Sequence, residues 1–218
     1  MPAHFDLERA LIAKGLWPVA GFDEVGRGPL AGPVCVAAVI LDPDNLPSEA
    51  DDSKKLNAAR REALYHEILQ RALAVSVAMA PAAEIDALNI RGATLACMAR
   101  AARSLALAPA FALVDGRDLP NLPCEGRAVI EGDGISLSIA AASIVAKVTR
   151  DRLMAGLDAL HPGYGFASHV GYPTRSHRAA LERLGPCRLH RRTFASVRDR
   201  VEKGVEAAEQ GALSLEEP

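Results

Sequence analysis

The sequence predicts an α/β fold in which a mixed central β-sheet is flanked by helices. Short β-rich segments alternate with helical ones along most of the 218 residues, a pattern typical of layered α/β structures. Half of the residues are apolar, which is enough for one compact domain with a proper core. Gly and Pro residues separate several of the segments and mark turns. We therefore expect one main domain with a small appendage.

Two neighbouring strands open the predicted sheet. The segments Val19–Glu24 and Val34–Leu41 are rich in β-forming residues. Between them lie residues that favour turns, namely Gly26, Gly28, Pro29, Gly32 and Pro33. Because this turn chemistry is strong, the two strands are expected to lie side by side.

A helix and a third strand follow. Asn57 is a favoured N-cap, and apolar residues recur at helical spacing from there to about Ala72. Val75–Met79 then alternates between larger apolar and small residues, as a half-buried strand does. The sequence therefore predicts a helix and a strand in this order.

The second half of the chain continues the alternation of strands and helices. The expected elements are a helix over Ile90–Leu105, short strands over Phe111–Val114 and Ala128–Ile130, and a long Ala-rich helix over Ser138–Leu160. Beyond this helix the chain is rich in turns up to Thr174 and then helical and basic. These elements complete the prediction of a mixed sheet with helices on it.

Charge is distributed unevenly along the chain. The formal net charge is −2, yet residues 171–203 hold nine basic and three acidic side chains, and residues 204–218 hold four Glu and no base. We expect a main domain over residues 1–170, a basic helical extension over 171–203 packed on it, and a disordered acidic tail over 204–218. A basic segment permits contact with phosphate but does not require it.

Cysteine spacing and hydropathy exclude several classes of protein. Cys35, Cys97, Cys124 and Cys187 lie far apart and form no C-x-x-C pair, so neither a zinc knuckle nor a redox dithiol is indicated. The longest apolar stretch, Pro33–Leu41, is about half as long as a membrane span. We expect a soluble, cytoplasmic protein with reduced thiols.

Acidic residues stand at the ends of three predicted strands. They are Asp23 with Glu24, Asp115, and Asp133. Strand ends in a parallel or mixed sheet bring distant positions together in one crevice. Several uncompensated carboxylates repel each other, so such a cluster makes physical sense mainly when a hard divalent cation neutralises it. The implied cofactor is Mn²⁺ or Mg²⁺.

Each of these acids also has a simpler explanation. Asp115 and Asp133 precede Gly, which is ordinary turn chemistry and the better explanation for either residue alone. Asp23 and Glu24 differ, because two adjacent charges in an apolar strand are costly without a partner. Alternation sends these two side chains to opposite faces, so both serve one site only where the strand bends, as the following glycines allow.

The segment Gly21–Gly28 also invites comparison with a phosphate-binding P-loop. The Lys and the Ser or Thr that reach phosphate and Mg²⁺ in that loop are absent here. Two acids inside the loop would in addition repel a triphosphate. The comparison therefore fails on chemistry.

Segments spread from about Val19 to Phe194 carry motifs in a fixed order. The first is Gly21–Gly32, with the sequence GFDEVGRGPLAG. The others are Asp52–Leu56, Val114–Gly116, Ala140–Asp151, Tyr164–Phe166, Gly171–Thr174 and His190–Phe194. Together these motifs resemble the bacterial ribonuclease HII family. A single short motif is weak evidence, but a collinear series over most of the chain is specific.

The resemblance implies a ribonuclease H-like fold and a catalytic, metal-binding site of four acids. Asp23, Glu24 and Asp115 match the family directly. The family's fourth Asp follows a Lys-Gly pair just ahead of the long helix, a position that corresponds to Asp133. Asp151 is the alternative, and its simpler explanation is a polar residue on the long helix.

The chain departs from the family pattern at two positions. Glu131 stands where the family carries the Lys of its Lys-Gly pair, which makes the assignment of Asp133 less direct. Val170 stands where relatives commonly carry Lys, a replacement that removes one candidate phosphate contact.

The resemblance also implies contacts with nucleic acid. The Gly-Arg-Gly turn, here Gly26, Arg27 and Gly28, approaches the backbone around the ribose 2′-OH. Glycine suits this because bare backbone can come close to a sugar, and the 2′-OH distinguishes RNA from DNA. Tyr172 packs on the neighbouring deoxyribose, unless it is a turn aromatic that covers the core edge. Further candidates for phosphate binding, each otherwise a surface charge, are Lys54, Lys55, Lys147, Arg191 and Arg192.

The implied enzyme is an endonuclease whose partner is nucleic acid. It hydrolyses the RNA strand of RNA–DNA hybrids and incises 5′ of single ribonucleotides embedded in duplex DNA, by two-metal-ion catalysis that leaves 5′-phosphate and 3′-OH ends. One alternative is another phosphoryl-transfer enzyme of the same fold, such as a junction resolvase or transposase core, against which the Gly-Arg-Gly turn and Tyr172 speak. A second alternative is an inactive RNA–DNA binding module, against which the four retained acids argue.

Overall fold

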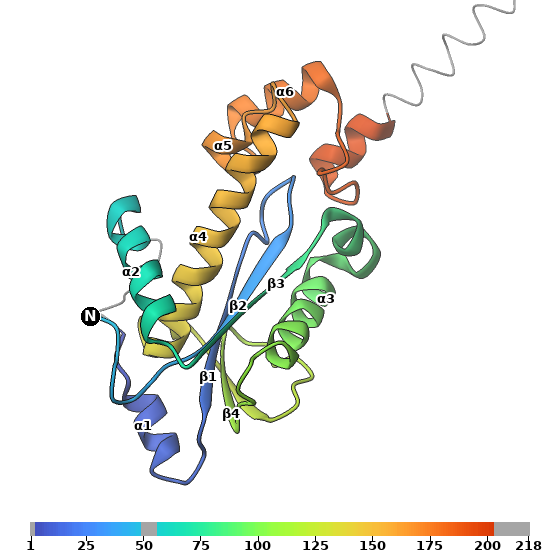
Figure 1. Cartoon of the computed structure of the whole chain (residues 1–218). Coiled ribbons are helices and arrows are strands. Elements are labelled where there is room, and N and C mark those ends of the chain that lie inside the picture. Colours follow the sequence, from blue (N-terminus) through green and yellow to red (C-terminus); the bar gives the residue numbers. More distant parts are fainter. Residues whose placement is uncertain (1–2, 49–55, 203–218) are drawn as a thin grey trace, which may run out of the picture. The chain divides into compact units, whose positions relative to one another are not determined.

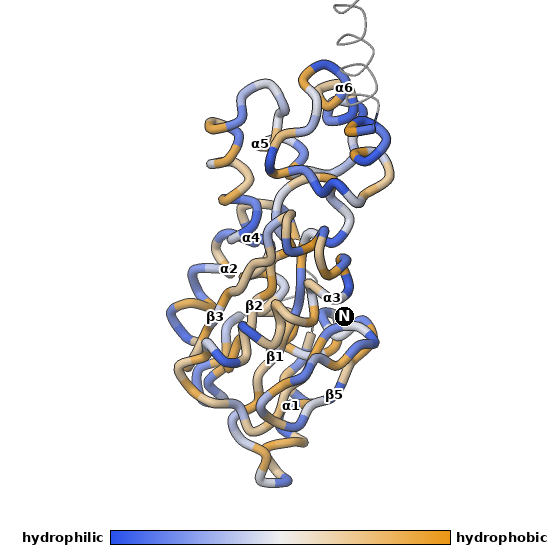
Figure 2. Tube along the Cα trace, turned by 90° about the vertical axis from the view of Figure 1, so that its right-hand side faces the viewer, coloured by the Kyte–Doolittle hydropathy of each residue, from blue (hydrophilic) through white to orange (hydrophobic). Residues whose placement is uncertain are grey.

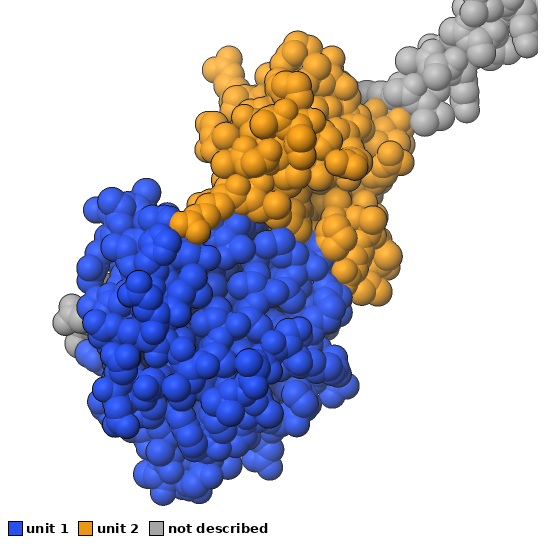
Figure 3. Space-filling model, viewed as in Figure 1, with its two compact units in different colours: residues 1–27, 34–80, 90–150 blue, residues 28–33, 81–89, 151–218 orange. Residues whose placement is uncertain are grey.

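The computed structural model describes residues 3–48 and 56–202, which form two compact units. Unit 1 takes the described residues of Met1–Arg27, Val34–Ala80 and Ile90–Arg150. Unit 2 takes those of Gly28–Pro33, Pro81–Asn89 and Asp151–Pro218. Figure 3 shows the two units in different colours.

Unit 1 is built on a five-stranded mixed sheet with the order β3-β2-β1-β4-β5 (Figure 1). Its strands are β1 (Val19–Val25), β2 (Val34–Ile40), β3 (Ala74–Ala80), β4 (Phe111–Asp115) and β5 (Glu125–Val129). Strands β1, β2 and β3 are antiparallel neighbours, whereas β4 runs parallel to β1 and β5 parallel to β4. The mixed sheet and all five predicted strands are confirmed.

Helices of unit 1 cover both faces of the sheet (Figure 1). Helix α2 (Ala58–Arg71) and the first part of α4 (Leu137–Leu160) pack on one face, where they meet Cys35, Ala37 and Val39 of β2. The part of α3 (Ala82–Arg103) that belongs to unit 1 lies on the other face. In Figure 2 the strands β1 and β2 are mostly apolar, as a sheet covered on both faces requires.

A short helix at the start of the chain, α1 (Asp6–Ile12), was not predicted. Its Glu8 is fully buried. The Oε1 atom of Glu8 accepts a hydrogen bond from Ser136 Oγ at 2.6 Å and another from Ser138 N at 2.9 Å. The helix is therefore held by contacts with residues far along the sequence, which a local pattern does not reveal.

Unit 2 combines the end of α4 with α5 (Phe166–His169), α6 (Arg175–Leu184) and the turn Gly28–Pro33. Its main core is formed by Ala31, Met154, Tyr164, Phe166 and Ala180. Helix α6 begins at the N-cap Thr174, whose Oγ1 accepts a hydrogen bond from His177 N at 3.2 Å. The predicted helical segment after Thr174 is thus confirmed.

The predicted division into residues 1–170 and 171–203 stays a prediction. The two compact units divide the sequence at other positions, because α4 gives its residues up to Arg150 to unit 1 and the following ones to unit 2. The predicted acidic tail over residues 204–218 lies outside the described residues. Among the helices that the structure describes, none is both long and apolar enough to cross a membrane.

Candidate active site

Asp23 and Glu24 lie near the carboxyl end of β1 and point to opposite faces of the sheet. Asp23 pairs with Ala37 and Glu24 with Val36. Ala37 belongs to the core beneath α2 and α4, so Asp23 faces α4 and Glu24 faces the other side. The chain leaves the strand at Gly26, which has a φ of +93°. The opposite orientation and the glycine turn both agree with the expectation from the sequence.

Asp23 is a buried carboxylate among other carboxylates. Only 5% of its surface is exposed. Burial raises the pKa of Asp23 well above its ordinary value, and the negative charges of Glu24 and Asp115 raise it further. Hydrogen bonds from Ser143 and from Glu24 N, the latter at 2.7 Å, act in the opposite direction. A positive charge beside Asp23 would therefore be strongly stabilising.

Asp115 and Asp133 come together beside β1. Asp115 ends β4 one residue after Val114, which pairs with Phe22 in parallel register. Its Oδ1 accepts a hydrogen bond from Gly132 N at 2.7 Å. Asp133 directly follows Gly132 and is buried in the short turn Gly132–Gly134. The structure thus brings the turn that carries Asp133 against Asp115.

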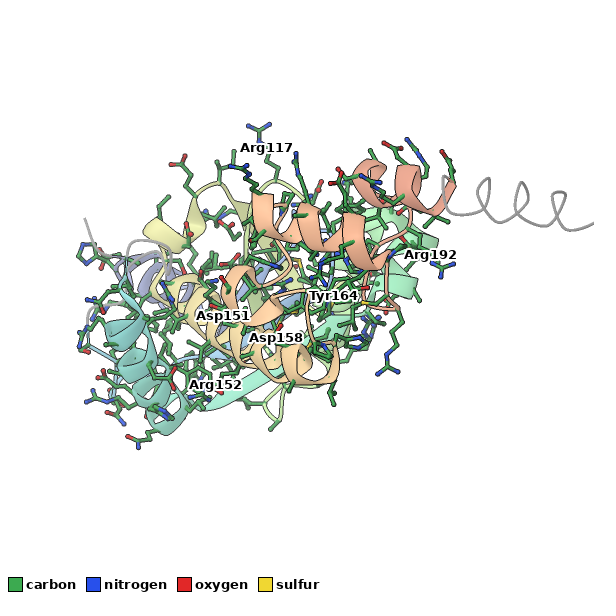
Figure 4. All side chains as sticks on the ribbon, turned by 90° about the horizontal axis from the view of Figure 1, so that it is seen from above. Arg117, Asp151, Arg152, Asp158, Tyr164 and Arg192 are labelled. Carbon is green, nitrogen blue, oxygen red and sulfur yellow. The ribbon has the colours of Figure 1, made fainter. Side chains whose placement is uncertain are left out.

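Asp151, the alternative to Asp133 as the fourth acid, lies on a different element. Asp151 lies on α4, is half-buried and belongs to unit 2 (Figure 4). Asp23, Glu24, Asp115 and Asp133 all belong to unit 1. The hydrogen bond between Gly132 N and Asp115 favours Asp133 as the fourth acid.

A pocket opens on the side of the sheet that Glu24 faces. Glu24 and Asp115 line it together with Arg27, Arg91 and Arg117. The Nη1 atom of Arg27 lies 3.3 Å from Glu24 Oε1, and the side chain of Arg117 projects outward in Figure 4. Neither Arg91 nor Arg117 was predicted from the sequence. The signal for Arg117 was its position directly after the Asp115-Gly116 motif.

The donor chemistry of the site suits a hard divalent cation. All four predicted ligands are carboxylates, which Mg²⁺ and Mn²⁺ prefer. Within residues 3–48 and 56–202, no three His, Cys, Asp or Glu side chains are arranged to hold an ion as they stand. Glu24 in particular is paired with Arg27. A cation at Asp23 therefore fits the site by its charge.

The second glycine of the Gly-Arg-Gly turn lies beside Tyr172 in unit 2. A β-carbon at Gly28 would stand 3.8 Å from Tyr172 Cε1. Leu30 N donates a hydrogen bond to Gly171 O at 2.8 Å, which ties the turn to the loop that carries Tyr172. The Tyr172 side chain is 38% exposed. A bare backbone segment and an accessible aromatic ring are thus adjacent.

The first glycine of the same turn is covered by an arginine whose role was not predicted from the sequence. Gly26 leaves no room for a β-carbon, which would overlap the Nε atom of Arg150. Arg150 is fully buried. Its side chain therefore packs on the Gly-Arg-Gly turn and limits the conformations of that turn.

The predicted phosphate-binding residues lie in different environments. Arg191 is fully buried and donates from Nε and Nη2 to Gly32 O at 3.1 and 2.9 Å, which favours a role inside unit 2. Arg192 is exposed and its side chain projects from the surface (Figure 4). Lys147 is half-buried on α4. Lys54 and Lys55 lie outside the described residues.

Comparisons with known proteins agree on one family. The sequence model described as ribonuclease HII matches residues 20–197. Ribonuclease HII of Azorhizobium caulinodans is 61% identical over 194 residues, which is 89% of this chain and 74% of that protein. Ribonuclease H2 of Pyrococcus horikoshii OT3 superposes with a TM-score of 0.73 at 26% identity, covering 85% of this chain and 97% of that one. Bst-RNase HIII in complex with Mn²⁺ has a TM-score of 0.66 over 88% of this chain and 72% of its own, and its 18% identity shows a shared fold.

Proposed function

Because the chain belongs to the ribonuclease HII family, we propose that Asp23, Glu24, Asp115 and Asp133 form its catalytic centre. The protein is an endoribonuclease with a ribonuclease H-like fold that cleaves RNA in RNA–DNA hybrids and at ribonucleotides embedded in DNA. The observation that carries the proposal is the buried Asp23, whose carboxylate is coupled to those of Glu24 and Asp115. Groups with strongly perturbed pKa values are typical of catalytic sites.

Enzymes of this family depend on divalent metal ions, and a structure of Bst-RNase HIII contains Mn²⁺. For this chain the cofactor is Mg²⁺ or Mn²⁺, held by the four carboxylates. Two such ions, when bound, supply an activated water and charge stabilisation for the leaving 3′-oxygen. Asp23 interacts electrostatically with both Glu24 and Asp115, so it would be the carboxylate best placed to hold a metal ion together with either of them. The products carry 5′-phosphate and 3′-OH ends.

Recognition of the substrate falls to the Gly-Arg-Gly turn and Tyr172. The backbone at Gly28 approaches the ribose 2′-OH, and the exposed ring of Tyr172 packs on the next deoxyribose. A 2′-OH and a following deoxyribose are thus read by Gly28 and Tyr172, which both belong to unit 2. Arg27, Arg91 and Arg117 line the pocket beside the acids and are further candidates for phosphate contact.

Family membership removes one alternative and leaves one to experiment. A junction resolvase or transposase core is excluded as the identity of the chain by the match over residues 20–197. An inactive binding module would have no reason to keep the carboxyl group of Asp23 buried beside two further carboxylates. A cleavage assay on a hybrid duplex separates an enzyme from such a module.

The fourth carboxylate can be decided by two matched substitutions. We expect Asp133→Asn to lose most activity, roughly 10²-fold or more, because its turn contacts Asp115. Asp151→Asn should lose little, because Asp151 is explained as a polar residue on α4. Initial cleavage rates of both folded variants, measured at saturating Mg²⁺ on one hybrid substrate, provide the comparison. The reverse order of damage would assign the fourth acid to Asp151.

The exposed Arg192 should contribute a phosphate contact. Arg192→Ala is expected to weaken binding to all duplexes. It should also reduce the slope of log K against log salt by about one, because binding releases fewer counterions when one phosphate contact is lost. Binding titrations at several salt concentrations measure the slope, with Lys14→Ala as the control at an exposed position that carries no predicted contact. Arg191→Ala should instead lower stability, because Arg191 is buried against Gly32 O. An unchanged slope for Arg192→Ala would show that Arg192 makes no phosphate contact and is a solvated surface charge.

A further inference from the structure

Three buried histidines lie next to the loop that carries Tyr172 in unit 2. His169, His177 and His190 are 7%, 0% and 2% exposed. The rings of His169 and His177 stack with centroids 4.3 Å apart. Buried polar groups are costly unless they are hydrogen-bonded, so the partners of these rings show what the cluster does.

One chain of hydrogen bonds runs through His190 and His177 to the backbone of Tyr172. A backbone N–H can only donate, so His190 Nδ1 accepts from Cys187 N at 3.0 Å. A carbonyl can only accept, so His177 Nδ1 donates to Tyr172 O at 2.9 Å. The Nε2 atoms of the two rings are 3.2 Å apart, and the proton between them must belong to His190. The two ends of the chain thus fix both tautomers.

The third histidine holds the residue before Tyr172. Gly171 N donates to His169 Nδ1 at 3.2 Å, so the Nε2 atom of His169 donates to Tyr164 O at 2.9 Å. Gly171 has a φ of +87°, and a β-carbon there would overlap Ala31 O. The loop is therefore held on its N–H side by His169 and on its carbonyl side by His177.

This arrangement uses neutral rings. In each imidazole of the pair, one nitrogen donates a hydrogen bond and the other accepts one. A further proton on His177 would therefore place its Nε2–H against the Nε2–H of His190. Burial lowers the pKa of His190 to about 4, and it also lowers the pKa of His177. Both rings are neutral at neutral pH, and the hydrogen bonds keep their direction.

We propose that His177 and His190 are positioning residues that fix the carbonyl of Tyr172 and thereby aim its exposed ring at the substrate. Neither residue reaches the substrate itself, since both are buried. The proposal rests on the proposed function of Tyr172 as the residue that packs on the deoxyribose. It assigns to the two histidines a share in the selectivity for embedded ribonucleotides rather than in the chemical step.

Substitutions at His177 separate this role from mere support of the fold. His177→Phe keeps the ring volume but removes the donor to Tyr172 O, whereas His177→Asn retains an amide N–H near the position of Nδ1. We expect His177→Phe to raise KM about tenfold for a DNA duplex with one ribonucleotide, with kcat and the cleavage of a continuous RNA–DNA hybrid nearly unchanged. His177→Asn should restore most of the loss. Tyr172→Ala, measured in the same experiment, should also impair cleavage of the single-ribonucleotide duplex more than cleavage of the continuous hybrid.

Side-chain NMR tests the hydrogen-bond chain without an activity measurement. Proton–nitrogen correlation spectra of the wild-type histidines should show His177 in the Nδ1–H form and His190 in the Nε2–H form at pH 7. His177 in the Nε2–H form would overturn the proposal, as would equal losses by His177→Phe on both substrates.

If Tyr172→Ala impairs the single-ribonucleotide substrate and a folded His177→Phe does not, the positioning role of His177 fails while the role of Tyr172 stands. If Tyr172→Ala has no effect, the proposed function of Tyr172 fails even where the NMR spectra agree. Should His177→Phe not fold, the NMR spectra of the wild-type protein decide the proposal without it, since His177 in the Nε2–H form still contradicts the hydrogen-bond chain.

Discussion

Asp23→Asn is expected to abolish cleavage, by about 10³-fold or more, while the protein stays folded. The substitution removes the negative charge that makes Asp23 a metal ligand and keeps the size of the side chain. The asparagine Oδ1 can still accept the hydrogen bond from Glu24 N, which is 2.7 Å long in the wild type. Asp115→Asn should act in the same way, because Asp115 is coupled to Asp23.

The same substitution should not lower stability. The pKa of Asp23 is raised in the folded protein, so this carboxyl group opposes folding at pH values above its unfolded-state pKa, and an uncharged residue removes this opposition. We expect the free energy of unfolding of Asp23→Asn, measured with urea in the presence of a chelator, to equal or exceed that of the wild type. Asp6→Asn, at an exposed position of α1, is the control for both measurements. A folded Asp23→Asn that cuts hybrid at a near wild-type rate would show that Asp23 is not a metal ligand.

Gly21→Ala should strongly destabilise unit 1 although it adds only one methyl group. A β-carbon at Gly21 would overlap the backbone of Ser138 and Ile139 at the start of α4. Backbone atoms cannot move aside as a flexible side chain can, so β1 and α4 would have to separate. We expect a loss of about 3 kcal/mol or more in the free energy of unfolding, measured by urea denaturation.

A matched substitution on α4 controls for the added methyl group. Gly156 lies within the helix, and a β-carbon there would meet no neighbouring atom within 4 Å apart from the helix's own backbone. Gly156→Ala should therefore raise stability by about 0.5–1 kcal/mol through helix propensity alone. A Gly21→Ala variant as stable as the wild type would contradict the close approach of β1 and α4.

The regular elements were predictable from sequence where a local signal marks them. Asn57 caps α2 as predicted, since its side chain accepts a hydrogen bond from Arg60 N at 2.9 Å. Strand β5 begins at Glu125, earlier than the predicted Ala128, because its first residues carry no apolar alternation. Helix α3 begins at Ala82 rather than Ile90, and its first part is separated by Asn89, whose φ is 57°. That break hid the first part of α3 from a search for one continuous helical period.

The site was predictable in its acids and less so in its supporting residues. Asp23 and Glu24 stood out because charges inside an apolar strand need a reason. Arg191 shows the opposite case, since a basic residue in a basic segment suggests the surface, yet it is buried against Gly32 O. The pairing of His177 with His190 joins two segments 13 positions apart in the sequence, and only the fold of unit 2 brings them together.

A carboxylate-bound divalent metal centre that cuts beside one ribonucleotide can be tested directly. The protein is incubated with an end-labelled DNA duplex that contains a single ribonucleotide, in separate reactions with Mg²⁺, with Mn²⁺ and with EDTA. An all-DNA duplex of the same sequence is the control. We predict a cut on the 5′ side of the ribonucleotide with at least one of the metals, 5′-phosphate and 3′-OH ends, no cut with EDTA, and an intact all-DNA duplex. Cleavage that persists in EDTA would contradict the metal centre, and cleavage confined to long hybrids would contradict the recognition of a single 2′-OH.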